Sequence, residues 1–172
     1  KDAIDHGIAL CPEDRKEQGL VLGRSIRDNV SMPVLEKVKK GLFLDEKIEE
    51  TLTVDAVKRY SIKTPTIDKL VLELSGGNQQ KVIIAKWLLM NPKVLIMDEP
   101  TRGVDVGAKA EIYKLMRALA DQGVAIIIVT SDMEELLGVS DRIMVMCKGQ
   151  ITGSVKRKEF SQEKIMEYAT AI

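Results

Sequence analysis

Two short groups of residues in this chain have the types and spacing to act on a phosphate group. The first, Ser75-Gly76-Gly77, stands in front of a stretch with the apolar content of a buried helix. The N-terminus of a helix leaves backbone N–H groups unbonded and carries partial positive charge, and glycine lets an anion approach that backbone closely. For an isolated Ser-Gly-Gly, however, an ordinary serine N-cap is the better interpretation.

The second group, Asp98-Glu99, favours a phosphate site over an ordinary N-cap at Ser75. It ends the apolar run Val94 to Met97, which is typical of a strand, and α/β sheets bind ligands at the carboxyl ends of their strands. One carboxylate there could hold Mg²⁺ while the other orients or deprotonates a water, which is the division of roles that phosphoryl transfer requires. A lone Asp-Glu-Pro is more often a surface turn, but one that follows Ser-Gly-Gly by a single helix is far more specific.

Hydrophobic periodicity predicts the elements that position these groups. Residues 78–90 are apolar nearly all round and are expected to form a buried helix, which Asn91-Pro92 ends. Strands are expected at 93–97 and 125–129, on either side of a helix at 106–121 whose apolar residues recur at i, i+3, i+4 and i+7. A strand, a helix and a second strand, with near-continuous apolar strands, predict a βαβ unit in a parallel sheet.

The remaining segments give coarser expectations. A strand at 7–10 runs into the polar segment 11–16, which composition alone would assign to a solvated turn. A hairpin is expected over 142–155, followed by a short closing helix at 161–169. A helix at 45–60 is expected to place four apolar residues on one face: Ile48, Leu52, Ala56 and Tyr60.

Composition limits the possible functions. The 172 residues carry 26 basic and 26 acidic side chains, so the formal net charge is zero. A chain whose main task is to grip a phosphate backbone is expected to be strongly basic, so we expect no nucleic-acid partner. Cys11 and Cys147 have no metal-ligand spacing and are expected to be reduced thiols, and His6 is the single histidine. No apolar run approaches the ~20 residues of a membrane span.

With both groups in place, the chain resembles an ABC-type ATPase. Residues 74–78 resemble the signature motif of that family, 94–99 its Walker B strand and 101–105 its D-loop. More narrowly, LSGGNQQKVIIAKWL followed by DEPTRGVDVGAK resembles the C-terminal half of the double-length ATPases that power bacterial sugar importers. The resemblance extends from about Gly7 to Ser154.

The resemblance implies an α/β fold, namely a truncated P-loop NTPase core with a mainly parallel sheet and an inserted helical subdomain. Residues 1–23 and 91–172 are expected to form the partial RecA-like core, and residues 24–90 the helical subdomain that carries the signature. The sequence contains no G-x-x-x-x-G-K-[ST], so we expect the P-loop to lie before Lys1. Without it, the chain alone is expected to expose apolar surface, to be weakly stable or self-associating, and to be inactive.

The resemblance also implies roles for individual residues around ATP and Mg²⁺. Glu99 is expected to be the general base, and Asp98 to hold Mg²⁺ through a water. Asp105 is expected to bridge the interface with a second ATPase domain. The nucleotide held by that second domain is expected to meet the signature residues: Ser75, Gly76, Gly77, Asn78 and Gln79.

Three positions depart from the family pattern. Glu13 matches the glutamine of the Q-loop, and Ser131 matches a histidine that stabilises the transition state; both are assigned to the nucleotide site. A hydroxyl cannot carry the positive charge of an imidazole. Arg102 stands where a small residue is commoner, and its role stays open. We therefore expect two unequal composite sites, with Glu99 in the weaker one.

The implied function is that of part of the ATP-binding subunit of an ABC importer, which couples ATP hydrolysis to sugar uptake. The expected partners are a second ATPase domain, transmembrane permease subunits and, indirectly, a periplasmic or extracellular sugar-binding protein. The expected location is peripheral, at the cytoplasmic face of the cell membrane. One alternative is an ATPase of DNA repair or chromosome organisation, which is disfavoured because the insert is short and lacks heptads. The other is a regulatory half-domain that does not hydrolyse ATP.

Overall fold

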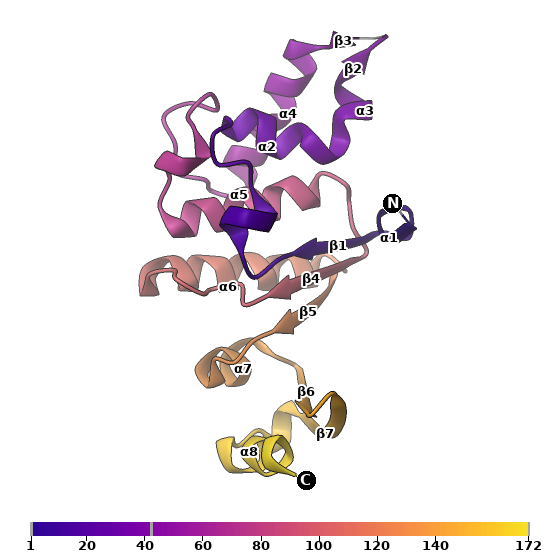
Figure 1. Ribbon diagram of the computed structural model, residues 1–172, viewed down its shortest axis with the longest axis vertical. Helices are drawn as coiled ribbons and strands as arrows, with labels where there is room; N and C mark the ends of the chain where they lie inside the picture. The colour runs from indigo at the N-terminus through magenta and orange to yellow at the C-terminus, as the bar shows by residue number, and fades with distance from the viewer. Residues whose placement is uncertain (1, 42, 172) are drawn as a thin grey trace. The chain divides into compact units, whose positions relative to one another are not determined.

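The computed structural model describes residues 2–41 and 43–171, which form two compact units. The first unit comprises Lys1–Val129 and the second Thr130–Ile172, and Figure 1 traces both from the indigo N-terminus to the yellow C-terminus. Among the described residues, no helix combines the length and the apolar character needed to cross a membrane.

The first unit combines a small sheet with several helices. The elements expected between residues 76 and 129 are all present, with ends that differ by no more than two residues from the prediction. In chain order the unit contains α1 (Asp2–Asp5), β1 (Ile8–Cys11), the π-helical turn η1 (Arg15–Gly19), α2 (Ile26–Ser31), η2 (Met32–Val34), α3 (Leu35–Val38), β2 (Lys39–Lys40), β3 (Phe43–Leu44), α4 (Glu46–Arg59), η3 (Val71–Glu73), α5 (Gly76–Leu88), β4 (Val94–Asp98), α6 (Val106–Asp121) and β5 (Ala125–Val129).

Strands β1, β4 and β5 form a three-stranded parallel sheet in that order (Figure 1). Successive side chains of each strand point to opposite faces of the sheet, and one face is covered while the other is open. On the open face Leu10, Ile127 and Val129 expose 47%, 52% and 53% of their surface, so the apolar surface expected from the sequence is present. The covered face carries the buried side chains Ala9, Cys11, Leu95 and Met97.

Helices α5 and α6 pack on each other and on the sheet, α5 against β1 and α6 against β5. Ten of the 13 residues of α5 are buried, which confirms that this helix lies inside the unit. Two of them are lysines, and each has a partner, as a buried charge requires. Lys81 donates to Glu111 at 2.6 Å and to the carbonyl of Ser61 at 2.9 Å, and Lys86 donates to the carbonyl of Gly19 at 3.1 Å.

Both cysteines are free thiols, as expected. Cys11 is fully buried in β1, and this burial raises the pKa of its thiol to about 12, although the nearby Lys86 acts in the opposite direction. Since the thiolate is the reactive form, Cys11 serves as a small apolar core residue.

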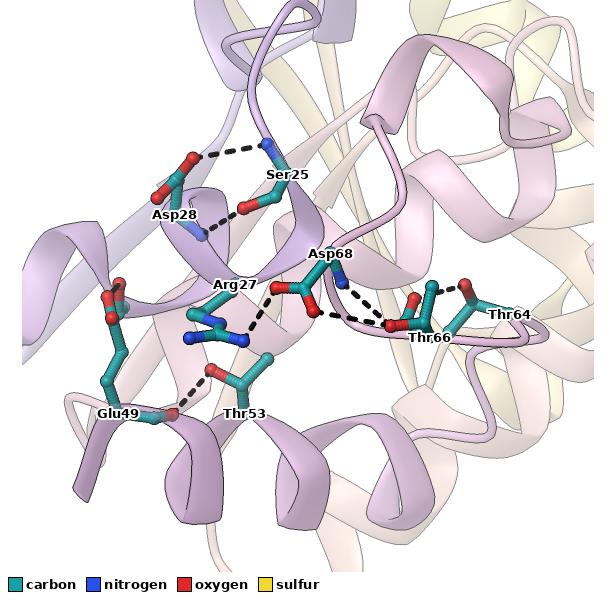
Figure 2. Close-up of polar contacts among 9 residues, drawn as sticks. Ser25, Arg27, Asp28, Glu49, Thr53, Thr64, Thr66 and Asp68 are labelled. Carbon is teal, nitrogen blue, oxygen red and sulfur yellow. Dashed lines mark hydrogen bonds and ion pairs between the residues drawn. The ribbon is translucent and has the colours of Figure 1, made fainter. Parts of the chain in front are cut away.

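The segment between α2 and η3 is held by a network of polar contacts, which Figure 2 shows at close range. Ser25 and Asp28 form a capping box at the start of α2. The guanidinium of Arg27 binds the Asp68 carboxylate at 2.6 Å and so ties α2 to the loop that precedes η3. These contacts fix the entry and exit of the segment relative to each other.

Helix α4 buries part of the apolar stripe that its spacing predicts, together with two polar residues. Ala56 and Tyr60 of the stripe are buried, as are Glu49 and Thr53, whereas Ile48 exposes 45% of its surface. The polar pair is satisfied inside: Ser31 donates to the Glu49 carboxylate at 2.5 Å, and Thr53 donates to the Glu49 carbonyl at 2.8 Å. The predicted stripe does share one face, but it lines an open groove.

The second unit is a small α/β assembly with its own core of Ile143, Val145 and Ile165. The expected hairpin and closing helix are both present, and Ser161 caps that helix by accepting from the Lys164 N–H at 3.1 Å. The unit contains α7 (Met133–Val139), β6 (Arg142–Cys147), β7 (Gln150–Lys156), the 3-10 turn η4 (Arg157–Glu159) and α8 (Gln162–Thr170).

We expect the ion pairs of Glu111 to make stability depend on pH at the acidic end. Hydrogen bonds from Lys81 and Lys63 lower the pKa of Glu111 from 4.5 to about 2. A carboxyl group with a lower pKa in the folded state stabilises that state above pH 4.5, and this contribution is lost as pH falls toward 2. The melting temperature of Glu111→Gln should therefore fall less steeply across this range than that of the parent. Glu50→Gln, at an exposed site on α4, should keep the parental slope, and a parental slope for Glu111→Gln would contradict the prediction.

Candidate functional site

The signature-like residues lie at the N-terminus of α5. Ser75 is exposed and occupies the N-cap position with φ −61° and ψ 155°, yet its side chain caps no backbone N–H. Its Oγ instead accepts a hydrogen bond from Asn78 Nδ2 at 3.0 Å. The N-cap side chain thus leaves the first-turn N–H groups uncapped, and no acidic residue stands in that turn. The helix N-terminus therefore keeps its capacity to bind an anion.

Close packing by neighbouring residues requires glycine at positions 76 and 77. A Cβ on Gly77 would stand 2.5 Å from the Cβ of Ala108 in α6. A Cβ on Gly76 would stand 3.0 Å from both Arg15 Nη2 and the carbonyl oxygen of Gly103. The first turn of α5 is thus closely packed at Gly77, which is buried, while Ser75 in front of it is exposed.

Asp98 closes β4, and Glu99 follows it at the carboxyl edge of the sheet. Glu99 has φ +43°, in the left-handed region that residues other than glycine rarely adopt. Its N–H donates to the carbonyl of Val129 at 2.8 Å, and its own carbonyl accepts from the Arg102 N–H at 3.1 Å. The neighbouring strand and the following turn therefore hold Glu99 in this conformation. Backbone strain of this kind concentrates at functional sites.

The polar segment after β1 is an ordered part of this region, not the solvated turn that composition favours. Asp14 caps η1 by accepting from two backbone N–H groups. Arg15 donates to the carbonyl oxygens of Arg102 at 2.6 Å and Gly103 at 3.3 Å. Glu13 forms an ion pair with the side chain of Arg102.

Asp105 and Gln79, two further candidate site residues, also have partners within the chain. Asp105 is the N-cap of α6, and its Oδ1 accepts from the Ala108 N–H at 2.9 Å. Gln79 is buried; its Oε1 accepts from Arg15 Nε at 3.4 Å and its Nε2 donates to the carbonyl of Val71 at 3.2 Å. Both side chains hold in place the helices that carry the candidate site.

The sequence profile of the ABC transporter family matches residues 3–102, which is more than half of the chain. The chain belongs to this family. The expected α/β fold is confirmed by cbiO1 of Clostridium perfringens, part of an ABC transporter complex. Its structure matches with a TM-score of 0.74 at 31% identity, over 94% of this chain and 62% of that one.

Curated ABC proteins give a narrower resemblance. The chain is 54% identical over 168 residues to a ribose import ATP-binding protein of Streptococcus agalactiae. It is 51% identical over 169 residues to a xylose import ATP-binding protein of Geobacillus kaustophilus. Both matches cover 98% of this chain and 34% of the relative, so the chain spans about a third of the length of these relatives.

The structure brings the residues that resemble the signature and the D-loop together with the segment after β1, around one side chain, Arg15. Sequence reasoning missed it, because an arginine in a polar segment has no signal of its own. The contact between Glu13 and Arg102, two departures from the family pattern, was equally hidden. Ser131 belongs to the second unit, and its role stays a prediction.

A groove of about 600 Å³ runs along α4 beside the end of α5. It is lined by the apolar stripe predicted from the sequence together with charged side chains. The lining residues include Ile48, Leu52, Ala56, Tyr60, Leu88 and Leu89, with Lys47, Asp55 and Arg59.

The Gly77→Ala substitution should destabilise the protein by ~1–3 kcal/mol, as overpacking does in a filled core. The added methyl group would stand 2.5 Å from the Cβ of Ala108, which cannot move without α6. Gly23→Ala is the control, because an added Cβ there has no neighbour within 4 Å. Urea unfolding of both variants measures the difference, and equal stabilities would show that α5 and α6 are not in tight contact.

Proposed function

We propose that this chain is part of the ATP-binding subunit of an ABC importer that couples ATP hydrolysis to the uptake of a sugar. The observation that carries the proposal is the uncapped, glycine-lined N-terminus of α5 behind the exposed Ser75. The sugar-import relatives, at about half identity over nearly the whole chain, support the choice of transport over DNA repair or chromosome organisation.

ATP and Mg²⁺ fit the residues of this region. No three acidic, histidine or cysteine side chains gather into a metal site within residues 2–41 and 43–171. Asp98 at the edge of the sheet therefore offers one carboxylate, and Mg²⁺ characteristically uses one or two carboxylates together with phosphate oxygens and water. When bound, Mg²⁺ supplies positive charge that neutralises the phosphates.

Ser75 is arranged to donate a hydrogen bond. A serine hydroxyl has one donor and two acceptor sites, and Asn78 Nδ2 already occupies one acceptor site. The O–H can then be directed to an oxygen of the γ-phosphate, next to the N–H groups of Gly76 and Gly77. Asn78 and Gln79 set the position of this helix end through their hydrogen bonds inside the chain. The ATP bound here is held by a second ATPase domain.

Glu99 acts at a different ATP site from Ser75, namely the site that uses this chain's own Walker B strand. Its carboxylate takes the proton of the attacking water, and the adjacent Asp98 would hold Mg²⁺. Asp105 faces the interface between the two ATPase domains. Glu13 and Ser131 replace residues that assist hydrolysis, so the site that uses Glu99 is the weaker of two composite sites.

The difference in activity between the two composite sites can be measured as ATP turnover in the intact transporter. Ser75→Arg should lower turnover by ~100-fold or more, the loss expected when a catalytically essential group is removed. Glu99→Gln should lower it by less than about tenfold, because the stronger site does not use Glu99. Ser154→Arg, at an exposed position of β7, controls for the added charge. If Glu99→Gln abolished turnover and Ser75→Arg had no effect, the proposed inequality would be wrong.

The partners of the intact protein are a second ATPase domain and the transmembrane permease subunits, with a sugar-binding protein acting through the permease. The protein is peripheral, at the cytoplasmic face of the membrane. The groove along α4 is where the permease docks. Its lining combines apolar residues, among them Ile48 and Leu52, with charged ones, which is the composition of a helix-binding groove.

Ile48→Glu tests the docking groove. The side chain exposes 45% of its surface, so the variant should fold normally, but a charge in the lining of the groove should weaken permease binding by ~5- to 30-fold (~1–2 kcal/mol). Leu72→Glu, at an apolar residue that exposes 53% outside the groove, is the matched control. Co-purification with the permease and permease-stimulated ATPase rates are the measurements. Equal losses in the two variants would place docking elsewhere.

A further inference from the structure

Two departures from the family pattern form one structural feature. Glu13, in the segment after β1, and Arg102, in the turn after β4, make an ion pair. Neither residue type is typical of its family motif, and the two side chains carry opposite charges. The Glu13 carboxylate, at the Q-loop position, is thus bound by Arg102 in the D-loop turn of the same chain.

Arg15 reinforces this contact at the backbone. Its guanidinium donates to the carbonyl oxygens of Arg102 at 2.6 Å and of Gly103 at 3.3 Å. Gly103 has φ +64°, and a Cβ on it would stand 3.3 Å from Arg15 Nη2, so glycine provides the room for this approach. The turn is therefore held through the Arg102 side chain by Glu13 and through its carbonyls by Arg15.

The same guanidinium reaches the first turn of α5. Arg15 Nε donates to Gln79 Oε1 at 3.4 Å, and Nη2 lies 3.0 Å from the place where a Cβ on Gly76 would stand. One planar side chain thus bridges the segment after β1, the turn after β4 and the helix end behind Ser75. A planar guanidinium with five N–H donors in fixed directions can hold three acceptors at set angles, which a lysine cannot do.

We propose that Glu13, Arg15 and Arg102 are positioning residues that fix the turn 101–105 relative to Ser75, and that Glu13 serves Arg102 and not the nucleotide. This rests on the proposed function of the Ser75 end of α5. The Glu13 and Arg102 side chains expose 45% and 68% of their surface, and exposed ion pairs contribute little to stability. The effect of the pair is therefore on the geometry of the composite site, and it should be visible in the turnover rate and not in the unfolding temperature.

A charge reversal in the full-length protein with its permease tests this proposal. Glu13→Arg and Arg102→Glu should each lower kcat by about tenfold, with less than about a twofold change in the KM for ATP. The double variant, which restores the pair with opposite polarity, should recover kcat to within about threefold of the parent. Arg15→Lys should lower kcat and not be rescued by either reversal, because one ammonium nitrogen cannot occupy the three positions from which Arg15 Nη1, Nη2 and Nε donate. Unfolding temperatures of the Glu13 and Arg102 variants should match the parent.

The pair Lys69–Glu73 provides a control, since its side chains expose 29% and 49% of their surface and its charged atoms lie 3.7 Å apart in the same unit. Reversing either or both of its charges should leave kcat unchanged. A double Glu13/Arg102 variant as slow as the product of the two single effects would overturn the proposal, as would single variants with parental kcat or a loss of kcat that follows the unfolding temperature.

Hydrogen exchange at the Val104 amide, which donates to the Thr101 carbonyl at 3.1 Å, gives a readout independent of catalysis. Protection should fall in each single variant and return in the double variant, and an unchanged rate in all three would contradict the positioning role. If the parent protein hydrolysed no ATP while this exchange pattern held, the proposed function would fail and the positioning role would stand.

Discussion

The close approach of α5 to α6 at Gly77 is the constraint on which the rest of the first unit depends. At that point a hydrogen atom fits where a Cβ would lie 2.5 Å from Ala108, and the Val104 side chain stands 3.6 Å from the same position. Helix α6 begins at this contact, capped by Asp105. The contact therefore fixes where α6 starts, and with it the turn that joins β4 to α6. Steric exclusion at one residue thus sets the spacing between the Ser75 end of α5 and the carboxylates after β4.

Packing alone would leave α5 free to slide or rotate, because its surface is apolar on nearly every side. The buried polar groups remove that freedom. Gln79, Lys81 and Lys86 bind partners on η3, on α6 and on η1 respectively, and a shift of one turn would leave each of them buried without a partner. An unpaired buried charge costs several kcal/mol, so the polar contacts select one position among many of similar apolar burial.

Sequence periodicity was enough to predict the parts of the fold that repeat a pattern. The strand-helix-strand unit of 94–129 and the hairpin of the second unit follow from apolar runs and turn residues, and all appear in the structure. The burial of Glu49 and Thr53 on α4 could not be predicted, because it depends on a hydrogen bond from Ser31 in another helix. The two-residue strands β2 and β3 are too short to carry any period. The role of Arg15 depends on carbonyl groups far along the chain, which no local pattern encodes.

The glycines of the signature-like segment show why residue type alone cannot establish a phosphate site. Packing against Ala108 and Arg15 already requires glycine at 77 and 76, so the two glycines fit a purely structural role as well as a phosphate site.

The behaviour of Ser75 distinguishes the structural role from the phosphate site. Elsewhere in the chain Ser25 and Ser161 behave as ordinary N-caps and accept from the N–H three residues ahead, at 3.0 and 3.1 Å. At the same position Ser75 makes no such bond and turns its oxygen to the Asn78 side chain. A helix that only needed a cap would use the serine it has. Leaving those N–H groups uncapped at an exposed helix end is an arrangement that an incoming anion can exploit and that an isolated helix cannot.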